Sequence, residues 1–363
     1  MESVWINGHS HLLGDYLKDP GTIDSLPVFE KEILSFIIEW KGGRDSFQLN
    51  SSGSTGTPKK IILHRDRMIL SAQSTLDFLG IAAGGKALLC LDPRYIAGKM
   101  VIVRSLIGHL DLYAIDPKSN PLNEFEPEYT IDLASFVPYQ ITEILEDSDS
   151  LKKFRNIKNV LIGGAGISPR LESKLRAFKN DIYHTFGMTE TVSHIALRPL
   201  SGMRKSRYFR VFPGIIIGKD EKGCLIVEGK ITGGEKLITN DLVEIVSKKE
   251  FEWKGRIDQV INTGGIKINI NLLEIRIRKI LESIKIHNEF FIDHISDEKL
   301  GDKIVLILES GSIDIDPDII KETLKKHLDR FEIPRQIQVI REFARTDTGK
   351  INRKLIMGQI QGL

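Results

Sequence analysis

The sequence predicts an α/β protein with a large N-terminal α/β domain and a small C-terminal α+β domain. Its length of 363 residues exceeds what one hydrophobic core usually supports, which favours two domains. The segment 159–175 reads as a strand, a glycine turn and a helix, an arrangement typical of α/β sheets that bind ligands at the carboxyl edge. From about Gly214 short strands alternate with turns, which predicts a small β barrel or a distorted sheet.

Helices and buried strands of the first domain follow from apolar spacing. A helix is expected over 66–79, where Asp66 can cap the start and Gly80 the end. Another is expected after Ser168 and Pro169, which suit the N-cap and N1 positions. The inward faces of the two helices carry Ile69, Ala72, Leu76 and Leu79, and Leu171, Leu175 and Phe178. Buried parallel strands are expected at 87–91 and 159–162.

The chain divides near Asp258, which gives domains 1–257 and 258–363. The barrel-like part before this point is expected to contain strands at 215–217, 224–227, 236–239 and 243–246. After it, one helix carries Leu273, Ile277, Ile280 and Leu281, and strands follow at 290–292 and 304–308. Asp316 and Pro317 then begin a helix whose apolar residues are Ile320, Leu324, Leu328 and Phe331. About 105 residues suffice for such a domain.

Composition excludes several classes of function. The chain is 41% apolar and 28% charged, with a net charge of only +2, so nothing indicates nucleic acid or a membrane as partner. Cys90 and Cys224 lie far apart in apolar runs and read as buried thiols in a reducing compartment. No basic-then-apolar leader and no apolar run of about 18 residues is present, so we expect a cytoplasmic protein.

The segment 51–59 is the most informative motif. Its glycines, hydroxyl groups and lysine can surround a polyphosphate, because glycine allows a close approach of backbone N–H groups. The spacing is not that of a Walker A loop, since Gly53 and Gly56 are three apart and Pro58 precedes Lys59. A flexible linker would have no reason to run directly into apolar residues. A phosphate-binding loop is therefore predicted.

This loop resembles that of the adenylate-forming superfamily, which includes acyl-CoA synthetases, peptide-synthetase adenylation domains and luciferases. Further motifs follow in that family's order: Thr185 to Thr191, Thr239-Asn240-Asp241, Gly255 to Asp258, Thr263-Gly264-Gly265 and Arg345 to Lys350. The resemblance covers residues 45–356. Fewer residues precede the phosphate loop than is usual, so part of the family's first subdomain is expected to be missing. Residues 137–140 and 186–198 look most like the o-succinylbenzoate–CoA ligase branch.

The resemblance implies a ligase that uses ATP, Mg²⁺ and CoA and passes through an acyl-adenylate. It assigns catalytic roles to Lys350, Thr189 and Glu190, with Thr189 at the α-phosphate and Glu190 holding Mg²⁺. Lys350 would act in adenylation and leave for thioester formation, as the small domain rotates about a hinge at Asp258. The ATP or AMP site would comprise Ser51, Ser52, Gly53, Ser54, Thr55, Gly56, Thr57, Lys59, Gly164, Ala165, Gly166, Phe186, Gly187, Met188, Asp241 and Arg256.

Roles within this site follow the chemistry of each group. Phe186, where the family usually has Tyr, would stack on adenine. Asp241 offers two acceptor oxygens to the ribose hydroxyls, although Asn240 replaces the usual Gly before it. Arg256 would help to hold the ribose or a phosphate. Gly164, Ala165 and Gly166 would flank the adenine, and from the sequence they equally suit a tight helix–sheet contact.

The CoA tunnel and the acyl pocket rest on fewer residues. The resemblance places Gly264, Gly265 and Lys267 along the pantetheine tunnel. An aromatic dicarboxylate needs an apolar slot and a cation, for which the candidates are Arg94, Tyr95, Gly98, His194 and Arg198. His194 could equally be a satisfied loop histidine.

Two function classes therefore compete. The first is an acid–thiol ligase, with o-succinylbenzoate, another aryl or acyl acid, or a carrier protein as substrates, and with a homodimer as a possible assembly. The second is a catalytically silent nucleotide-binding relative. Retention of Glu190 and Lys350 favours the enzyme.

Overall fold

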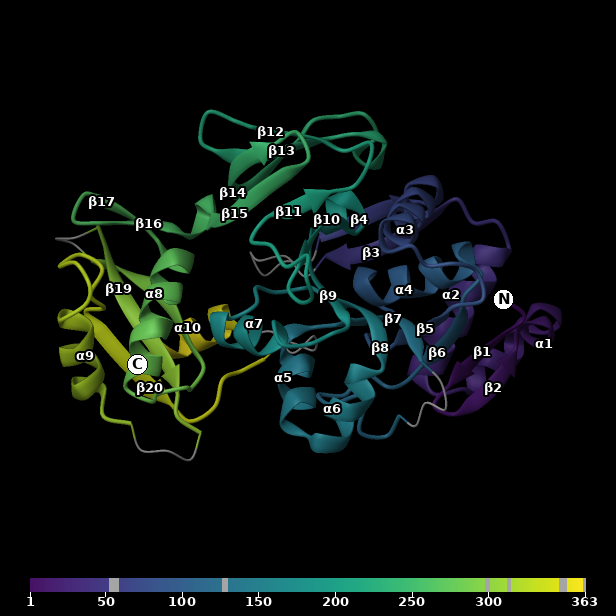
Figure 1. The fold of residues 1–363 in the computed structure, drawn as a ribbon, viewed down its shortest axis with the longest axis horizontal. Helices are drawn as coiled ribbons and strands as arrows, with labels where there is room; N and C mark the ends of the chain where they lie inside the picture. The colour runs from purple at the N-terminus through teal and green to yellow at the C-terminus, as the bar shows by residue number, and fades with distance from the viewer. Residues whose placement is uncertain (52–58, 126–129, 298–300, 312–314, 346–350, 362–363) are drawn as a thin grey trace. The chain divides into compact units, whose positions relative to one another are not determined.

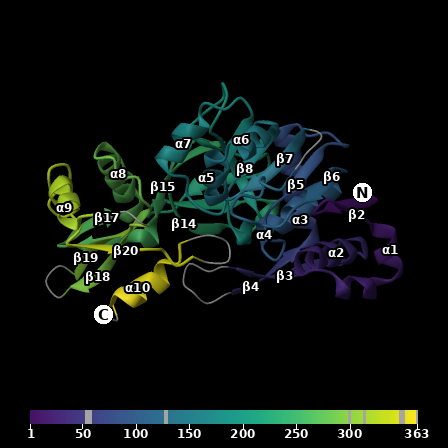
Figure 2. The same cartoon turned by 90° about the horizontal axis from the view of Figure 1, so that it is seen from below.

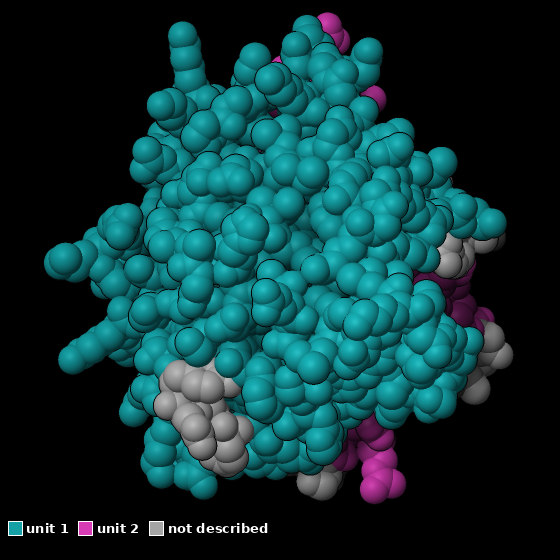
Figure 3. Space-filling model, turned by 90° about the vertical axis from the view of Figure 1, so that its right-hand side faces the viewer, with its two compact units in different colours: residues 1–218, 227–237, 245–252 teal, residues 219–226, 238–244, 253–363 magenta. Residues whose placement is uncertain are grey.

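The computed structural model describes residues 1–51, 59–125, 130–297, 301–311, 315–345 and 351–361 (Figure 1). For Asn50, Ser51 and Lys59 it describes the backbone only. The chain forms two compact units, coloured in Figure 3: unit 1 comprises residues 1–218, 227–237 and 245–252, and unit 2 comprises residues 219–226, 238–244 and 253–363. Each unit is described by itself.

Unit 1 is built on a large sheet whose strands follow the order β11-β10-β9-β8-β7-β5-β6-β1-β2. The central strands β6, β5, β7, β8 and β9 run parallel, whereas β2 and β10 pair in antiparallel fashion with their neighbours. Buried parallel strands read as short apolar runs, as predicted at 87–91 and 159–162. The bounds are β1 Ser3–Ile6, β2 His9–Leu12, β5 Lys86–Leu89, β6 Asp111–Ala114, β7 Ile131–Phe136, β8 Ile157–Ile162, β9 Asp181–Gly187, β10 His194–Pro199 and β11 Phe209–Val211.

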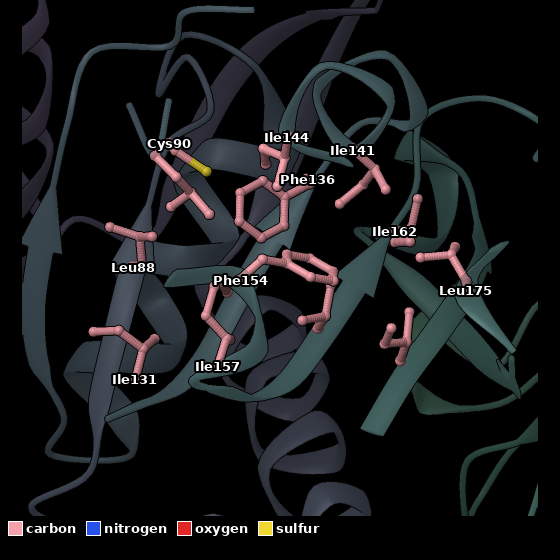
Figure 4. Packing of buried hydrophobic residues seen from close by; sticks show 14 of the residues in the cluster. Leu88, Cys90, Ile131, Phe136, Ile141, Ile144, Phe154, Ile157, Ile162 and Leu175 are labelled. Carbon is pink, nitrogen blue, oxygen red and sulfur yellow. The ribbon is translucent and has the colours of Figure 1, made fainter. Parts of the chain in front are cut away.

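Helices cover both faces of this sheet, with α2, α3 and α4 on one side and α5, α6 and α7 on the other (Figure 1 and Figure 2). Phe136 and Phe154 are fully buried where the second group packs on the strands (Figure 4). The helices are α1 Leu13–Lys18, α2 Val28–Lys41, α3 Arg65–Leu79, α4 Ile96–Ile107, α5 Pro138–Glu146, α6 Ser148–Arg155 and α7 Pro169–Leu175, with 3₁₀ turns η1 Pro20–Ser25, η2 Thr189–Thr191 and η3 Lys230–Thr232.

The predicted helices of unit 1 are confirmed with two changes, the first of which is that α7 ends at Leu175, before Phe178. Gly80 ends α3 in the left-handed conformation (φ 66°), and the Ser168 side chain caps α7 by accepting from Leu171 N. Asp66 does not cap α3, because the helix begins one residue earlier and His64 is its N-cap. The Asp66 carboxylate instead accepts from Arg67 N at 2.8 Å.

The strands after Gly214 continue the open sheet beyond β11 in the order β15-β14-β13-β12, with β15 beside β11. No closed barrel forms among the described residues. The strands predicted at 236–239 and 243–246 are a single strand. Thr239, Asp241 and Val243 alternate on its buried face, and polar residues at two of these positions hide the alternation. The bounds are β12 Ile216–Lys219, β13 Cys224–Glu228, β14 Leu237–Ser247 and β15 Glu250–Arg256.

In unit 2 a second sheet has the order β17-β16-β19-β18, with β20 beside β19. Alternate residues of its strands enter two cores. Ile292 and Leu306 pack with helices α8 and α9, whereas Phe291 and Val305 pack with α10. The elements are η4 Ile257–Gln259, β16 Val260–Thr263, β17 Ile266–Asn269, α8 Ile270–Ser283, β18 Phe290–Asp297, β19 Gly301–Glu309, α9 Pro317–Lys325, β20 Gln336–Ile340 and α10 Arg353–Gln361.

The remaining expectations for single residues are largely confirmed. Asp316 caps α9 by accepting from Asp318 N, although the helix ends at Lys325, before Leu328. Cys90 and Cys224 are free and buried. Within the described ranges, no helix has both the length and the apolar character needed to cross a membrane.

Candidate active site

Two predicted nucleotide-binding turns lie at the same edge of the unit 1 sheet. Strands β8 and β9 are parallel neighbours with Ile162 opposite His184, so the turns at their carboxyl ends are adjacent. Gly163 to Gly166 follow β8, and Met188 to Glu190 follow β9. A Cβ atom on Gly163 would lie 2.3 Å from Thr185 Oγ1, which explains the glycine where the turns approach each other.

The turn after β9 is held in one conformation by its own residues. Thr191 is fully buried, and its Oγ1 accepts from Met188 N (3.0 Å) and donates to Ser193 O (2.8 Å). Val192 has φ 65° and ψ −54°, and Ser193 N donates to Thr191 O at 2.7 Å. This is a γ-turn at a β-branched residue, a rare and strained conformation. Such strain persists only where the surroundings enforce it, and functional segments are where it is commonly found.

Gly187 makes this turn possible. A Cβ atom at this position would lie 2.3 Å from Ser193 O and 2.4 Å from His194 Cα. The backbones of β9 and β10 therefore approach more closely here than any side chain allows. The pairing is also irregular, because the register shifts between His194 and Ala196.

The turn presents Thr189 half-buried and Glu190 exposed. No cluster of three or more His, Cys, Asp or Glu able to hold a metal occurs in the described part of the chain. Mg²⁺ is usually bound by one or two carboxylates together with substrate phosphates. One exposed carboxylate at Glu190 therefore fits an ion that arrives with ATP.

Phe186 points into the core. The residue is only 9% exposed, and its ring packs edge-on against Phe251 and at a tilt against Phe209, with ring centroids 5.0 Å and 5.6 Å away. Stacking of Phe186 on adenine stays a prediction, and the aromatic packing alone accounts for a ring at this position.

The turn after β8 is supported by a partly buried histidine that sequence reasoning missed. His184 hydrogen-bonds to the backbone of Ala165, and its Nδ1 lies 3.4 Å from Arg198 Nη2. Burial and the Arg198 charge lower the pKa of His184 to about 3. Arg198 in turn makes a bidentate ion pair with Glu172 of α7 (3.1 and 2.8 Å). The pKa of Glu172 is lowered because the contacts with Arg198 and Arg176 together outweigh its desolvation.

The predicted acyl-pocket residues do not form one cluster of free groups. Arg94 pairs with Asp92 at 2.6 Å, and Arg198 pairs with Glu172, so each cation already has a carboxylate. Tyr95 is the N-cap residue of α4. A Cβ atom on Gly98 would meet Asp92 O at 2.4 Å, so this glycine is required where the preceding loop crosses the helix.

His194 is a buried and satisfied histidine. Its Nε2 lies 2.9 Å from Thr75 Oγ1, and its Nδ1 lies 3.5 Å from Arg104 Nη2. Burial, with the nearby Arg104 charge, lowers the pKa of His194 well below its usual range. Of the two interpretations left open by the sequence, these contacts favour the structural one.

The phosphate loop joins a two-stranded hairpin, β3 (Ser46–Ser51) and β4 (Lys59–His64), in which Ser51 pairs with Lys59. Phe47 of this hairpin stacks on Trp40 of α2 with ring centroids 5.6 Å apart. The Arg65 guanidinium also lies over the Trp40 ring, 4.1 Å from the ring centroid. The stem of the loop is therefore anchored. Of the predicted phosphate ligands, Ser52, Gly53, Ser54, Thr55, Gly56 and Thr57 lie outside the described residues.

In unit 2, Asp241 is held for hydrogen bonding by a residue the sequence reasoning missed. Trp253 Nε1 donates to Asp241 Oδ1 at 2.8 Å. Arg256 Nη1 lies 3.9 Å from Asp241 Oδ2, and burial raises the pKa of Asp241 despite these contacts. Arg256 binds the predicted hinge residue Asp258 through Nε (2.9 Å) and Nη2 (2.6 Å). Asn240, where the family usually has Gly, donates to the same carboxylate at 3.3 Å.

The predicted tunnel residues lie at the tip of the β16–β17 hairpin. Gly264 and Gly265 are its two turn residues, with φ 60° and 83°. Two-residue turns with positive φ at both positions match the twist of a hairpin and favour glycine. A Cβ atom on Gly264 would also lie 2.5 Å from the Phe331 ring. Lys267 is exposed beside this turn, and the tunnel assignment stays a prediction.

Lys350 lies outside the described residues, but its flanks are anchored within unit 2. Arg345 forms an antiparallel bridge with Ile351 and an ion pair with Glu289 at 2.7 Å. Arg353, at the start of α10, pairs with the partly buried carboxylate of Glu274 at 3.0 Å. These contacts fix both ends of the segment that carries Lys350.

Known proteins share this architecture and sequence pattern. A sequence profile described as AMP-binding enzyme matches residues 47–236. The crystal structure of an acyl-CoA synthetase (AMP-forming)/AMP-acid ligase II-like protein from Dyadobacter fermentans is 34% identical in sequence, with a TM-score of 0.62, and the match covers 93% of this chain and 97% of that chain. The chain belongs to the AMP-binding enzyme family.

Other relatives of this AMP-binding enzyme are more distant. The 2-succinylbenzoate–CoA ligase of Staphylococcus epidermidis is 24% identical over 85% of this chain and 69% of that protein. The o-succinylbenzoate CoA synthetase (MenE) of Bacillus subtilis, solved in complex with ATP and magnesium ion, has a TM-score of 0.66 at 19% identity, with 85% of this chain and 69% of that chain covered. Family and relatives together confirm the predicted enzyme class, an AMP-forming acyl-CoA synthetase.

Proposed function

We propose that this AMP-binding enzyme is an o-succinylbenzoate–CoA ligase of menaquinone biosynthesis. The observation that supports this substrate is the sequence similarity to 2-succinylbenzoate–CoA ligase along most of the chain. The adjacent turns at 163–166 and 187–190 support the nucleotide half of the site, because they offer backbone groups and a carboxylate at one sheet edge.

The first half-reaction would be adenylation. A carboxylate oxygen of the acid attacks the α-phosphorus of ATP, the bond to the β-phosphate oxygen breaks, and pyrophosphate leaves. Ser51 to Lys59 would surround the phosphates, Thr189 would contact the α-phosphate, and Glu190 would hold Mg²⁺. When bound, Mg²⁺ neutralises negative charge on the phosphate oxygens. Lys350 would bring a positive charge to the carboxylate and the α-phosphate.

The second half-reaction would be thioester formation. The CoA thiol loses its proton to solvent, its sulfur forms a bond to the carbonyl carbon of the acyl-adenylate, the bond from that carbon to the phosphate oxygen breaks, and AMP leaves. Rotation of the C-terminal domain, 258–363, about Asp258 would withdraw Lys350 and bring Gly264, Gly265 and Lys267 to the thiol. Asp241 and Arg256 would keep the ribose in place through both steps.

Related functions share this machinery. The acid could be another aryl or acyl acid, or the acceptor a carrier-protein phosphopantetheine, since Arg94 and Arg198 both have carboxylate partners and neither is favoured as the cation for a second carboxylate. A silent nucleotide-binding relative would have no need of Glu190 or Lys350. We further propose a cytoplasmic enzyme that acts on small molecules, not on nucleic acid or membranes, with a homodimer as a possible assembly.

The proposal is tested by pyrophosphate release from Mg·ATP with o-succinylbenzoate and with a panel of aryl and fatty acids, each with and without CoA. We expect release only with o-succinylbenzoate, with its CoA thioester as product. Release with a different acid would keep the mechanism and overturn the pathway. No pyrophosphate release with any acid of the panel, from a protein that still binds ATP, would favour the non-catalytic relative.

A variant pair tests the division of labour. Lys350→Ala should abolish pyrophosphate release but spare thioester formation from supplied acyl-adenylate. Lys354→Ala, which removes an exposed lysine of α10, is the matched control and should leave both steps unchanged. Equal loss of both half-reactions in Lys350→Ala would contradict the assignment.

A further inference from the structure

A buried arginine lies behind the turn that presents Thr189 and Glu190. Arg104 of α4 is only 2% exposed, and within the described ranges no carboxylate pairs with it. Its Nη2 donates to Ser193 Oγ at 3.0 Å, and its buried Nε has no hydrogen-bond partner in the described part of the protein. Burial lowers the pKa of Arg104 to about 9, with no acidic group to offset it.

The neighbouring histidine has a fixed tautomer. Thr75 Oγ1 donates its one proton to Ser71 O at 3.0 Å, so it must accept from His194 Nε2 at 2.9 Å. His194 is then protonated on Nε2, and its Nδ1 lone pair faces Arg104 Nη2 at 3.5 Å. The result is a directional chain from Arg104 through His194 to Thr75, which connects α4 to α3.

This cluster is attached to the strained part of the catalytic turn. Ser193 follows Val192, whose backbone has the unfavourable φ of 65°, and His194 begins β10. Residues in such conformations persist only when their surroundings over-determine them. Gly187 and Thr191 restrain the turn from one side, while Arg104 and Thr75 restrain it from the helices.

An uncompensated buried charge is a poor device for stability alone. A well-packed apolar side chain of similar volume is commonly neutral or stabilising when it replaces buried ionic groups. The presence of Arg104 at this position therefore indicates a requirement other than folding. We propose that Arg104 is a positioning residue, which holds Ser193 and thereby the Thr189–Glu190 turn in the geometry that adenylation requires. This inference rests on the proposed function.

The test compares Arg104→Met, Arg104→Lys and Ser193→Ala with Ser105→Ala as control. Ser105 is fully buried on the same helix and donates only to Val101 O, so its loss removes a buried hydroxyl without touching the turn. Hydrogen exchange of the amides 188–193 is measured on the ligand-free protein. Pyrophosphate release is measured as kcat, KM for Mg·ATP and the Mg²⁺ concentration at half-saturation.

We expect Arg104→Met to keep the melting temperature while exchange at 188–193 becomes at least tenfold faster. Its kcat should fall about 100-fold, the effect of a shift near 1 Å at a reacting group. The half-saturating Mg²⁺ concentration should rise, because Glu190 is displaced. Ser193→Ala should act in the same direction, Arg104→Lys should restore part of the loss, and Ser105→Ala should resemble wild type.

Unchanged exchange and unchanged Mg²⁺ dependence in Arg104→Met would overturn the inference. If that variant does not fold, Ser193→Ala decides by the same two measurements. If wild type releases no pyrophosphate with any acid, the proposed function fails, while the exchange measurement still decides whether Arg104 holds the turn.

Discussion

Acidification should destabilise unit 1 through His184, which lies beneath the turn at Ala165. The residue is partly buried, its ring hydrogen-bonds to the Ala165 backbone and lies 3.4 Å from Arg198 Nη2, and desolvation with the Arg198 charge lowers its pKa from 6.5 to about 3. Because the folded-state pKa lies below the unfolded-state value, the unfolded chain binds the extra proton. The stabilising contribution is therefore fully present above pH 6.5, and it is lost as the pH falls from 6.5 towards 3.

The magnitude follows from these two pKa values. At pH 5 an unfolded histidine is almost fully protonated, whereas His184 in the native protein remains neutral. The free energy of unfolding should therefore be lower by about 2 kcal/mol at pH 5 than at pH 8 on account of this residue alone. His194, whose pKa is also lowered well below 6.5, changes stability in the same direction.

The assay is urea denaturation of wild type and His184→Gln at pH 8 and pH 5. Glutamine can hydrogen-bond but does not titrate. The difference in free energy of unfolding between the two proteins should therefore shift by about 2 kcal/mol in favour of the variant when the pH falls from 8 to 5. His9→Gln, at an exposed histidine of β2, is the control and should show no such shift. A difference that does not change with pH, or an NMR titration of the His184 ring near pH 6.5, would refute the reasoning.

Further substitutions test the turn, the ribose ligand and a helix start. Gly187→Ala places a methyl group 2.3 Å from Ser193 O, so pyrophosphate release should fall at least 100-fold, and wild-type activity would contradict the close approach. Trp253→Phe removes the hydrogen bond from Trp253 Nε1 to Asp241 (2.8 Å). KM for ATP should rise about tenfold with little change in kcat, and an unchanged KM would show that Trp253 does not hold Asp241 for the ribose. Gln140→Ala removes hydrogen bonds to Val137 N, Cys90 O and Lys118 O. Urea denaturation should therefore show a free energy of unfolding lower by about 2–4 kcal/mol, and an unchanged value would show that these bonds are dispensable.

Local patterns predicted those elements whose cause is local. The α3 helix and its Gly80 cap, the Ser168 cap of α7 and the Asp316 cap of α9 follow from residues within a few positions of each other. Strand β14 escaped this reasoning because Asn240 and Asp241 are typical of turns. In the structure Asp241 faces inward, and Trp253 from the next strand satisfies its carboxylate.

For the site, motif order predicted two turns that the structure places at one sheet edge, but it did not predict the residues that support them. In the structure Ile162 and His184 are neighbours in parallel strands, which brings the turn after 159–162 close to the motif at 185–191. Arg104 and Ser193 are 89 positions apart, and Arg198 and Glu172 are 26 apart, so no spacing rule connects them. A lone Arg in a helix is expected to be exposed. Only the tertiary structure shows that α4 places one in the interior.

The supports of the two turns use the same physical device. His184, which hydrogen-bonds to Ala165, is partly buried, and Arg104, which donates to Ser193, is almost fully buried; both polar groups lose hydration and gain few or no opposite charges. A hydrophobic side chain at either position would fill the space, but it could not fix the direction of a backbone carbonyl or a hydroxyl group. Stability and order of the turns should therefore separate in variants: apolar replacements keep the fold and loosen the turns. This separation is the behaviour expected of residues retained for the geometry of a site.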